Sequence, residues 1–112
     1  MQARLTIKPL GVNAAWQGRR FKTPEYQSFE KQVLLSLKPT KQKFDGMIRV
    51  EYFFGFSSKL ADIDGPIKLI QDILCKKYGF DDRQIFELNA RKCIVPKGEE
   101  FIEFSIENLL PF

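Results

Sequence analysis

Apolar residues change their spacing along this chain of 112 residues, and this change limits the fold more than any other feature of the sequence. In residues 46–56 and 101–107 every second side chain is apolar, which is the pattern of a strand with one buried face. Residues 4–9 show the same alternation, and residues 84–95 are also typical of a strand. The side chains predicted to point inward from the two clearest strands are Ile48, Val50, Tyr52 and Phe54, and Ile102, Phe104 and Ile106.

Two other segments carry apolar residues at helical spacing. The first begins at residues 23–25, where a threonine can cap the free backbone N–H groups and a proline suits the first helical position, and Pro39 ends it. The second is expected over residues 64–78, with Pro66 in its first turn. The predicted buried stripes are Tyr26, Phe29, Val33 and Leu37 on the first helix, and Ile67, Ile70, Leu74 and Tyr78 on the second.

The remaining segments are expected to be connections. Residues 10–22 have no clear period and indicate a long loop, a kind of segment that often carries function. Residues 96–98, Pro-Lys-Gly, indicate a hairpin turn between the last two strands. The resulting order, β-α-β-α-β-β, predicts an α+β fold in which one domain over residues 1–112 combines a mixed sheet with two helices.

Composition limits the location and the cofactors. No stretch approaches the roughly 20 apolar residues that span a bilayer, and the N-terminus lacks the features of a signal peptide, so we expect a cytoplasmic protein. The two cysteines, Cys75 and Cys93, lie in apolar stretches and are expected to be small buried residues. Since the chain has no His and no closely spaced Cys pair, zinc is disfavoured, and any metal would be Mg²⁺ or Mn²⁺ held by carboxylates.

Charge is divided unevenly along the chain. The net charge is +4, but residues 1–49 carry ten Lys or Arg and three Asp or Glu, while residues 50–112 carry eight and eleven. A basic half joined to an acidic half suits a phosphate-binding surface beside a cation site. Charge alone, however, is explained more simply by an ordinary basic protein with solvated side chains.

The most informative stretch begins with two carboxylates, Asp62 and Asp64, just before the second predicted helix. Lys68 follows Asp64 by four residues, one turn along the same helix face, and Asp72 continues that stripe. Carboxylates that hold a divalent cation stabilise the charge that develops when a phosphodiester is hydrolysed, and they make a bound water more acidic. A lysine beside them is placed to contact the scissile phosphate.

A second acidic pair, Asp81 and Asp82, follows that helix. A helix of this length is about 22 Å long, so the pair cannot reach Asp62 from the helix end itself. Two routes remain open: strand 84–95 lies beside strand 46–56 and returns the turn, or a second subunit supplies the carboxylates. Each pair taken alone is adequately explained by ordinary helix capping or turn chemistry.

Taken together, these residues resemble the RusA family of Holliday junction resolvases. The family pattern is Asp-x-Asp-Asn, a Lys four residues after the second Asp, a helix, then Asp-Asp-x-Gln-Val and a further Lys on the next strand. The resemblance spans nearly the whole chain in order, and Gly65 stands where the family has Asn. The matching residues here are Asp62, Asp64, Lys68, Asp81, Asp82, Gln84, Ile85 and Lys92, with Asn13, Trp16, Arg19 and Arg20 in the N-terminal loop.

The resemblance implies a small cytoplasmic enzyme of bacterial or phage origin that cuts four-way DNA junctions as a homodimer with Mg²⁺. It makes Asp62, Asp64 and Asp82 the metal ligands and Lys68 a catalytic or phosphate-contacting base. It also implies a set of DNA contacts, namely Asn13, Arg19, Arg20, Lys22 and Lys92.

Two other classes of function stay open at this stage. A branched-DNA-binding protein would have kept the fold without the chemistry, and a structural protein would carry its acidic patches only as surface. The intact acidic set favours the enzyme over both alternatives. Glu51, in the second predicted strand, is a weaker candidate for an additional metal ligand.

Overall fold

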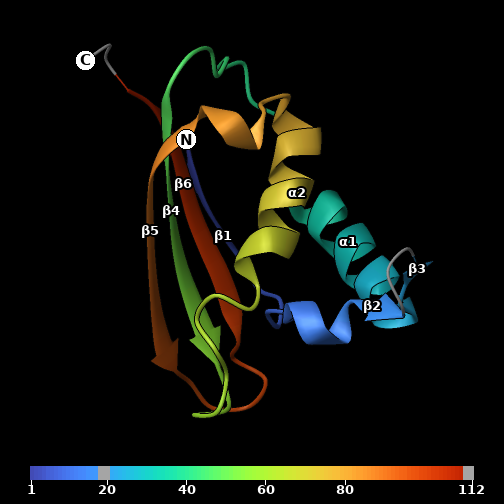
Figure 1. The fold of residues 1–112 in the computed structure, drawn as a ribbon. Coiled ribbons are helices and arrows are strands. Elements are labelled where there is room, and N and C mark those ends of the chain that lie inside the picture. The colour runs from blue at the N-terminus through green and yellow to red at the C-terminus, as the bar shows by residue number, and fades with distance from the viewer. Residues whose placement is uncertain (18–20, 110–112) are drawn as a thin grey trace.

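A computed structural model describes residues 1–17 and 21–109. Its centre is a four-stranded sheet in the order β1 (Gln2–Leu5), β6 (Phe101–Asn108), β4 (Ile48–Phe56) and β5 (Ile85–Ile94). Strand β4 pairs antiparallel with β6 and parallel with β5 (Figure 1). The predicted α+β class with a mixed sheet is therefore confirmed.

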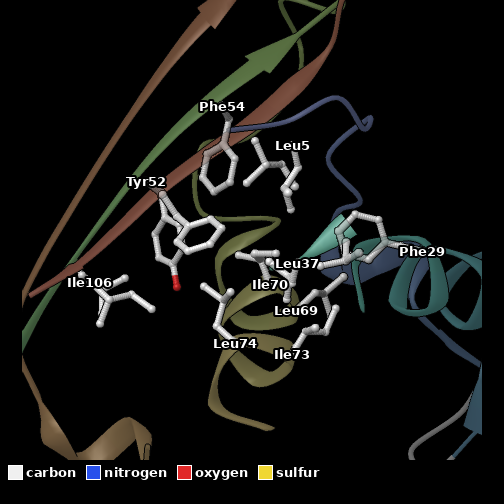
Figure 2. Packing of buried hydrophobic residues seen from close by; sticks show 14 of the residues in the cluster. Leu5, Phe29, Leu37, Tyr52, Phe54, Leu69, Ile70, Ile73, Leu74 and Ile106 are labelled. Atoms are coloured by element: carbon white, nitrogen blue, oxygen red, sulfur yellow. The ribbon is translucent and has the colours of Figure 1, made fainter. Parts of the chain in front are cut away.

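Both helices lie on one face of this sheet, with α2 (Ile67–Tyr78) against the strands and α1 (Pro24–Ser36) packed beside α2 (Figure 1). The alternating strand residues predicted to point inward are all buried, as is the predicted stripe of the first helix. Figure 2 shows Tyr52 and Phe54 of the sheet facing Ile70 and Leu74 of α2. Burial of these alternating faces joins the sheet to both helices.

The ends of the helices follow ordinary capping chemistry. The Thr23 hydroxyl accepts a hydrogen bond from the Tyr26 backbone N–H at 3.2 Å and so caps α1. Gly79 ends α2 in a left-handed conformation with φ of 72°, which glycine adopts without a steric penalty.

The expected start of α2 at Asp64 was three residues too early, because Asp64 lies in a turn and Pro66 is the capping residue. The buried stripe of α2 is Leu69, Ile70, Ile73 and Leu74, with Ile67 and Tyr78 only partly buried.

The N-terminal segment differs from its prediction. The first strand ends at Leu5 instead of continuing to residue 9, because the Ile7 N–H donates to the Leu5 carbonyl at 3.0 Å and turns the chain. The expected loop 10–22 contains a short 3-10 helix, η1, and two short strands that pair with each other. Their bounds are Val12–Ala14 for η1, Trp16–Gln17 for β2 and Phe21–Lys22 for β3.

The expected hairpin between the last two strands is wrong. Residues 96–98 do make a turn, but β5 and β6 lie on opposite sides of β4 and do not pair with each other. At the end of β5, the Val95 N–H donates to the Phe56 carbonyl, which keeps the strand on β4 as the chain crosses to the other side. The turn at residues 96–98 is compatible both with a hairpin and with a connection that crosses β4. The sequence alone therefore favoured the hairpin, which is the simpler connection.

Cys75 and Cys93 are free thiols and half-buried, where full burial was expected. Within residues 1–17 and 21–109, no helix is long and apolar enough to cross a membrane.

Candidate functional site

Asp62 and Asp64 lie in the turns that connect β4 to α2. The Gly65 N–H donates to the Asp62 carbonyl and the Ile67 N–H to the Asp64 carbonyl, each at 3.3 Å. Both carboxylate side chains are exposed, and both line a cleft of about 430 Å³. Asn13 of η1 lines the same cleft, so three of the predicted site residues come together here.

Residues 57–66, which we call the acidic loop, are held at three places along their length. The Lys92 ammonium on β5 donates to the Ala61 carbonyl at 2.7 Å, and the Val12 N–H donates to the Gly65 carbonyl at 3.0 Å. Ser57, at the start of the loop, donates its hydroxyl to the carboxylate of Glu100 at 2.8 Å. The loop is therefore fixed from three separate parts of the fold.

Lys92 makes a contact within its own chain that the resemblance did not imply. It was expected to contact DNA, yet its ammonium is directed at the acidic loop of its own chain. A charged donor bound to a backbone carbonyl positions the loop that carries Asp62 and Asp64.

Lys68 lies between two carboxylates on the outer face of α2. Its ammonium is 3.2 Å from Asp72 Oδ1, one helical turn further on, and 3.8 Å from Asp82 Oδ2. The hydrogen bond to Asp72, helped by the charge of Asp82, raises the pKa of Lys68 above its ordinary value. Lys68 therefore carries its positive charge at neutral pH.

Asp82 reaches Lys68 because the chain reverses after Gly79. Residues Asp82–Gln84 form a second 3-10 helix, η2, which Asp81 caps by accepting from the Arg83 N–H at 2.9 Å. The Arg83 side chain also donates to Asp81, and these bonds lower the pKa of Asp81 to about 2. Asp81 is thus committed to the turn, whereas Asp82 is directed back along α2.

A second cleft of about 410 Å³ adjoins this group and is lined by Lys22, Asp72, Cys75 and Asp82, among others. The Lys22 ammonium is 3.0 Å from Glu30 and 5.0 Å from the centre of the Tyr26 ring. Burial, together with the charges of Asp82 and Asp72, raises the pKa of the Cys75 thiol to about 11, so it is an unreactive thiol at neutral pH.

The three predicted metal ligands are divided between the two clefts. Asp62 and Asp64 line the first, whereas Asp82 lies with Lys68 and lines the second. In the described part of the chain, no three His, Cys, Asp or Glu side chains are placed so as to hold a single ion. Two carboxylates with an amide oxygen still fit Mg²⁺, which takes one or two protein carboxylates and completes its shell with water and phosphate.

Other expected residues lie elsewhere. Glu51 is on the sheet face opposite the helices, in a hollow with Asn89 and Arg91, away from both clefts. Arg19 and Arg20, expected to contact DNA, lie outside the residues that the structure describes.

Sequence reasoning missed Glu100. It is buried, it lines the cleft of Asp62 and Asp64, and it accepts hydrogen bonds from Ser57 and from the Gly98 N–H. A hydrogen bond from its own backbone N–H, together with those from Ser57 and Gly98, lowers the pKa of Glu100 below its usual value. In the sequence it is one of two consecutive glutamates after a turn, and no pattern distinguishes it from Glu99.

No protein-family model matches this chain, and no curated protein matches it either.

Proposed function

We propose that this chain is a Mg²⁺-dependent endodeoxyribonuclease that resolves four-way DNA junctions, as its resemblance to the RusA family implies. The observation that carries the proposal is the approach of Asp82 to Lys68. Fourteen residues separate the two in sequence, and they belong to the two halves of the acidic pattern. Their convergence beside Asp72 holds an ammonium, a group that can contact a phosphate, at a defined position on an exposed surface.

In this proposal Asp62 and Asp64 hold the metal ion, with Asn13 beside them. The bound ion supplies charge stabilisation at the attacking and leaving oxygens and lowers the pKa of a bound water. The acidic loop is held by Lys92, Val12 and Glu100, so the two carboxylates are positioned before DNA arrives.

Lys68 acts as a phosphate contact. A general base has to lose its proton near neutral pH, whereas Asp72 and Asp82 favour the charged form of Lys68. The ammonium therefore neutralises the scissile phosphate, and Asp82 orients the ammonium as a positioning residue. Mn²⁺ is the expected substitute for Mg²⁺, because it accepts the same oxygen ligands.

The proposed substrate is branched DNA. Residues 1–49 have a surplus of basic residues, ten against three acidic ones, whereas the rest of the chain has a surplus of acidic residues. The basic segment includes Asn13, which lines the cleft of Asp62 and Asp64, and Lys22, which lines the cleft of Asp82. Symmetric resolution needs two cuts in opposed strands, so the proposed active form is a homodimer of a cytoplasmic, bacterial or phage-encoded protein.

The test is cleavage of a synthetic four-way junction against a linear duplex of matched sequence, with Mg²⁺ or with EDTA. Wild-type protein is compared with Asp64→Asn, which keeps the side-chain shape and removes the charge. We expect paired nicks in the junction only, dependent on Mg²⁺, and lost in Asp64→Asn while junction binding survives. Failure of the wild type to cut the junction with either Mg²⁺ or Mn²⁺ would contradict the proposed enzyme.

One observation favours a second candidate, a branched-DNA-binding protein without catalysis. Asp82 lines a different cleft from Asp62 and Asp64, so a three-carboxylate metal site is not assembled within the described residues. For this candidate the same experiment gives tight junction binding by the wild type without cutting. It also gives no dependence of binding on Mg²⁺.

A further inference from the structure

Strand β5 forms one edge of the sheet and runs for ten residues (Figure 1). It pairs with β4 on one side, and among the described residues no strand pairs with its other side. A long unpaired edge exposes backbone donors and acceptors to other chains, and natural proteins normally shorten it, charge it or cover it. The outer edge of β5 is therefore a candidate interaction surface.

The side chains of β5 support this interpretation. Phe86, Leu88 and Ile94 are 62%, 47% and 45% exposed, which is high for large apolar residues on a strand. Leu88 and Ile94 are on the same face of the strand, because they are six residues apart, whereas Phe86 lies at the shift in register between Ile85 and Glu87. Leu88 and Ile94 stand beside Val50 and Phe56, whose side chains are buried under the helices. The apolar strip thus continues the core face of the sheet outward to its edge.

The backbone of β5 is also directed outward at regular positions. The Val95 N–H donates to Phe56 of β4, so odd-numbered residues of this strand point their backbone groups at β4. The even-numbered residues 88 to 94 consequently direct their N–H and C=O groups away from the sheet. These are the residues that another strand would bond.

We propose that the outer edge of β5 pairs with the β5 edge of a second copy of this chain. The two strands run antiparallel about a two-fold axis that passes beside Asn89. In this register Glu87 of each copy lies opposite Arg91 of the other, and Leu88 lies opposite Ala90. The two four-stranded sheets join into one continuous sheet.

Charge complementarity identifies the partner as a second copy. Glu87 and Arg91 lie on the same face of β5 and are equally distant from Asn89, so the two-fold pairing places opposite charges together twice. Within its own chain Glu87 also pairs with Arg49, and the Arg91 guanidinium lies over the Phe53 ring. Moving the axis to Arg91 would place two arginines opposite each other. Moving it to Ala90 would place Arg91 opposite Asn89 and leave Glu87 opposite Cys93.

The pairing has a geometric consequence for the proposed function, although it does not depend on that function. A two-fold axis perpendicular to a sheet keeps the same face of both halves on the same side. The helices of both copies, and with them both acidic loops, would then face one side of the joined sheet. That arrangement would let both acidic loops approach one junction from the same side.

The first test is sedimentation equilibrium of the wild-type chain, Leu88→Asp and Leu35→Asp. Leu35 is the matched control, since it is 79% exposed on α1, far from the edge in the fold. We expect the wild type and Leu35→Asp to sediment at twice the chain mass of 13.1 kDa. Leu88→Asp should weaken the dimer by about tenfold or more. Circular dichroism checks that both variants stay folded.

The second test is disulfide cross-linking, which reports the register. Asn89→Cys and Lys97→Cys are each made in a chain with Cys75 and Cys93 replaced by Ser. Residues facing each other across the axis are about 5 Å apart, so Asn89→Cys should form an intermolecular disulfide under mild oxidation. Lys97→Cys, in the exposed turn after β5, should remain a monomer on a non-reducing gel.

Three results would overturn the pairing. They are a wild-type monomer at every soluble concentration, a dimer that survives Leu88→Asp unchanged, and a dimer that Asn89→Cys does not cross-link. Each of these results is obtained without a nuclease assay. A protein that dimerises through this edge but does not cut DNA would therefore contradict only the proposed function.

Discussion

The ammonium of Lys92 donates a hydrogen bond of 2.7 Å to the carbonyl oxygen of Ala61, and so an edge strand holds the loop that carries Asp62 and Asp64. Ala61 immediately precedes the first of these carboxylates. Movement at this carbonyl is therefore transmitted directly to Asp62. The lysine is a structural support of the proposed metal site.

Lys92→Met removes this bond while keeping the length and apolar stem of the side chain. We expect faster amide hydrogen exchange in residues 58–65 and a free energy of unfolding lower by about 0.5–1.5 kcal/mol. Lys97→Met, on an exposed turn, is the control. If Lys92→Met instead reduces the salt dependence of DNA binding and leaves exchange unchanged, Lys92 is a phosphate contact as the resemblance implied.

Arg83→Met should raise the pKa of Asp81 from about 2 toward the ordinary 3.8, because the Arg83 side chain makes the main bond to this carboxylate. A lowered pKa in the folded state adds stability above the unfolded pKa, and this stability is lost as the pH falls through the folded value. Wild type and variant should therefore differ in urea midpoint above about pH 4 and converge near pH 2. Carboxyl NMR titration of Asp81 checks the shift directly, and an unchanged pKa would contradict it.

Much of the fold follows from local pattern. The alternation in β4 and β6 predicted their inward residues correctly, because a strand with one buried face has a strict period of two. Thr23 and Gly79 correctly predicted ends of helices, since each satisfies backbone groups that a helix leaves free. The position of β5 was not predictable in this way. It depends on which edge of β4 each later strand occupies, which is a property of the whole fold.

The candidate site also combines contacts that are local in sequence with contacts that depend on the whole fold. Lys68 and Asp72 are four residues apart on one helix, so their contact is local. The approach of Asp82 to Lys68 needs the left-handed turn at Gly79. Strand β5 does lie beside β4, which was one of the two routes left open for bringing the second acidic pair to Asp62, but Asp82 and Asp62 line different clefts. The bond from Lys92 to Ala61 joins residues 31 positions apart, and nothing near either residue indicates it.

Gly55→Ala tests the packing between β4 and β6. A Cβ atom at this position would overlap the ring of Phe101, which lies directly across from Gly55 on β6. That ring is fixed on both sides, with Phe53 at 5.3 Å and Arg4 at 4.0 Å, so it has little freedom to move. We expect a loss of about 1–3 kcal/mol in the free energy of unfolding.

Chemical denaturation of Gly55→Ala, Phe101→Ala and the double variant measures this coupling. The cost of Gly55→Ala should fall when the Phe101 ring is absent, giving a favourable interaction energy in the double variant. Gly11→Ala is the control, because a Cβ there meets nothing within 4 Å. Equal costs of Gly55→Ala with and without the ring would contradict the overlap.

Mg²⁺ should stabilise the folded protein in the absence of DNA, because Asp62 and Asp64 line one cleft and their carboxylate oxygens are ligands that Mg²⁺ prefers. A ligand that binds only the folded state adds RT ln(1 + [L]/Kd), which is about 1.4 kcal/mol at about 10 mM Mg²⁺ for a Kd of about 1 mM. For a domain of this size the melting temperature should rise by about 6 °C, and EDTA should reverse the rise. Asp64→Asn should abolish the response, whereas Glu51→Gln, on the opposite face of the sheet, should retain it. A rise of equal size in Asp64→Asn would place the ion elsewhere and remove Asp64 from the proposed ligands.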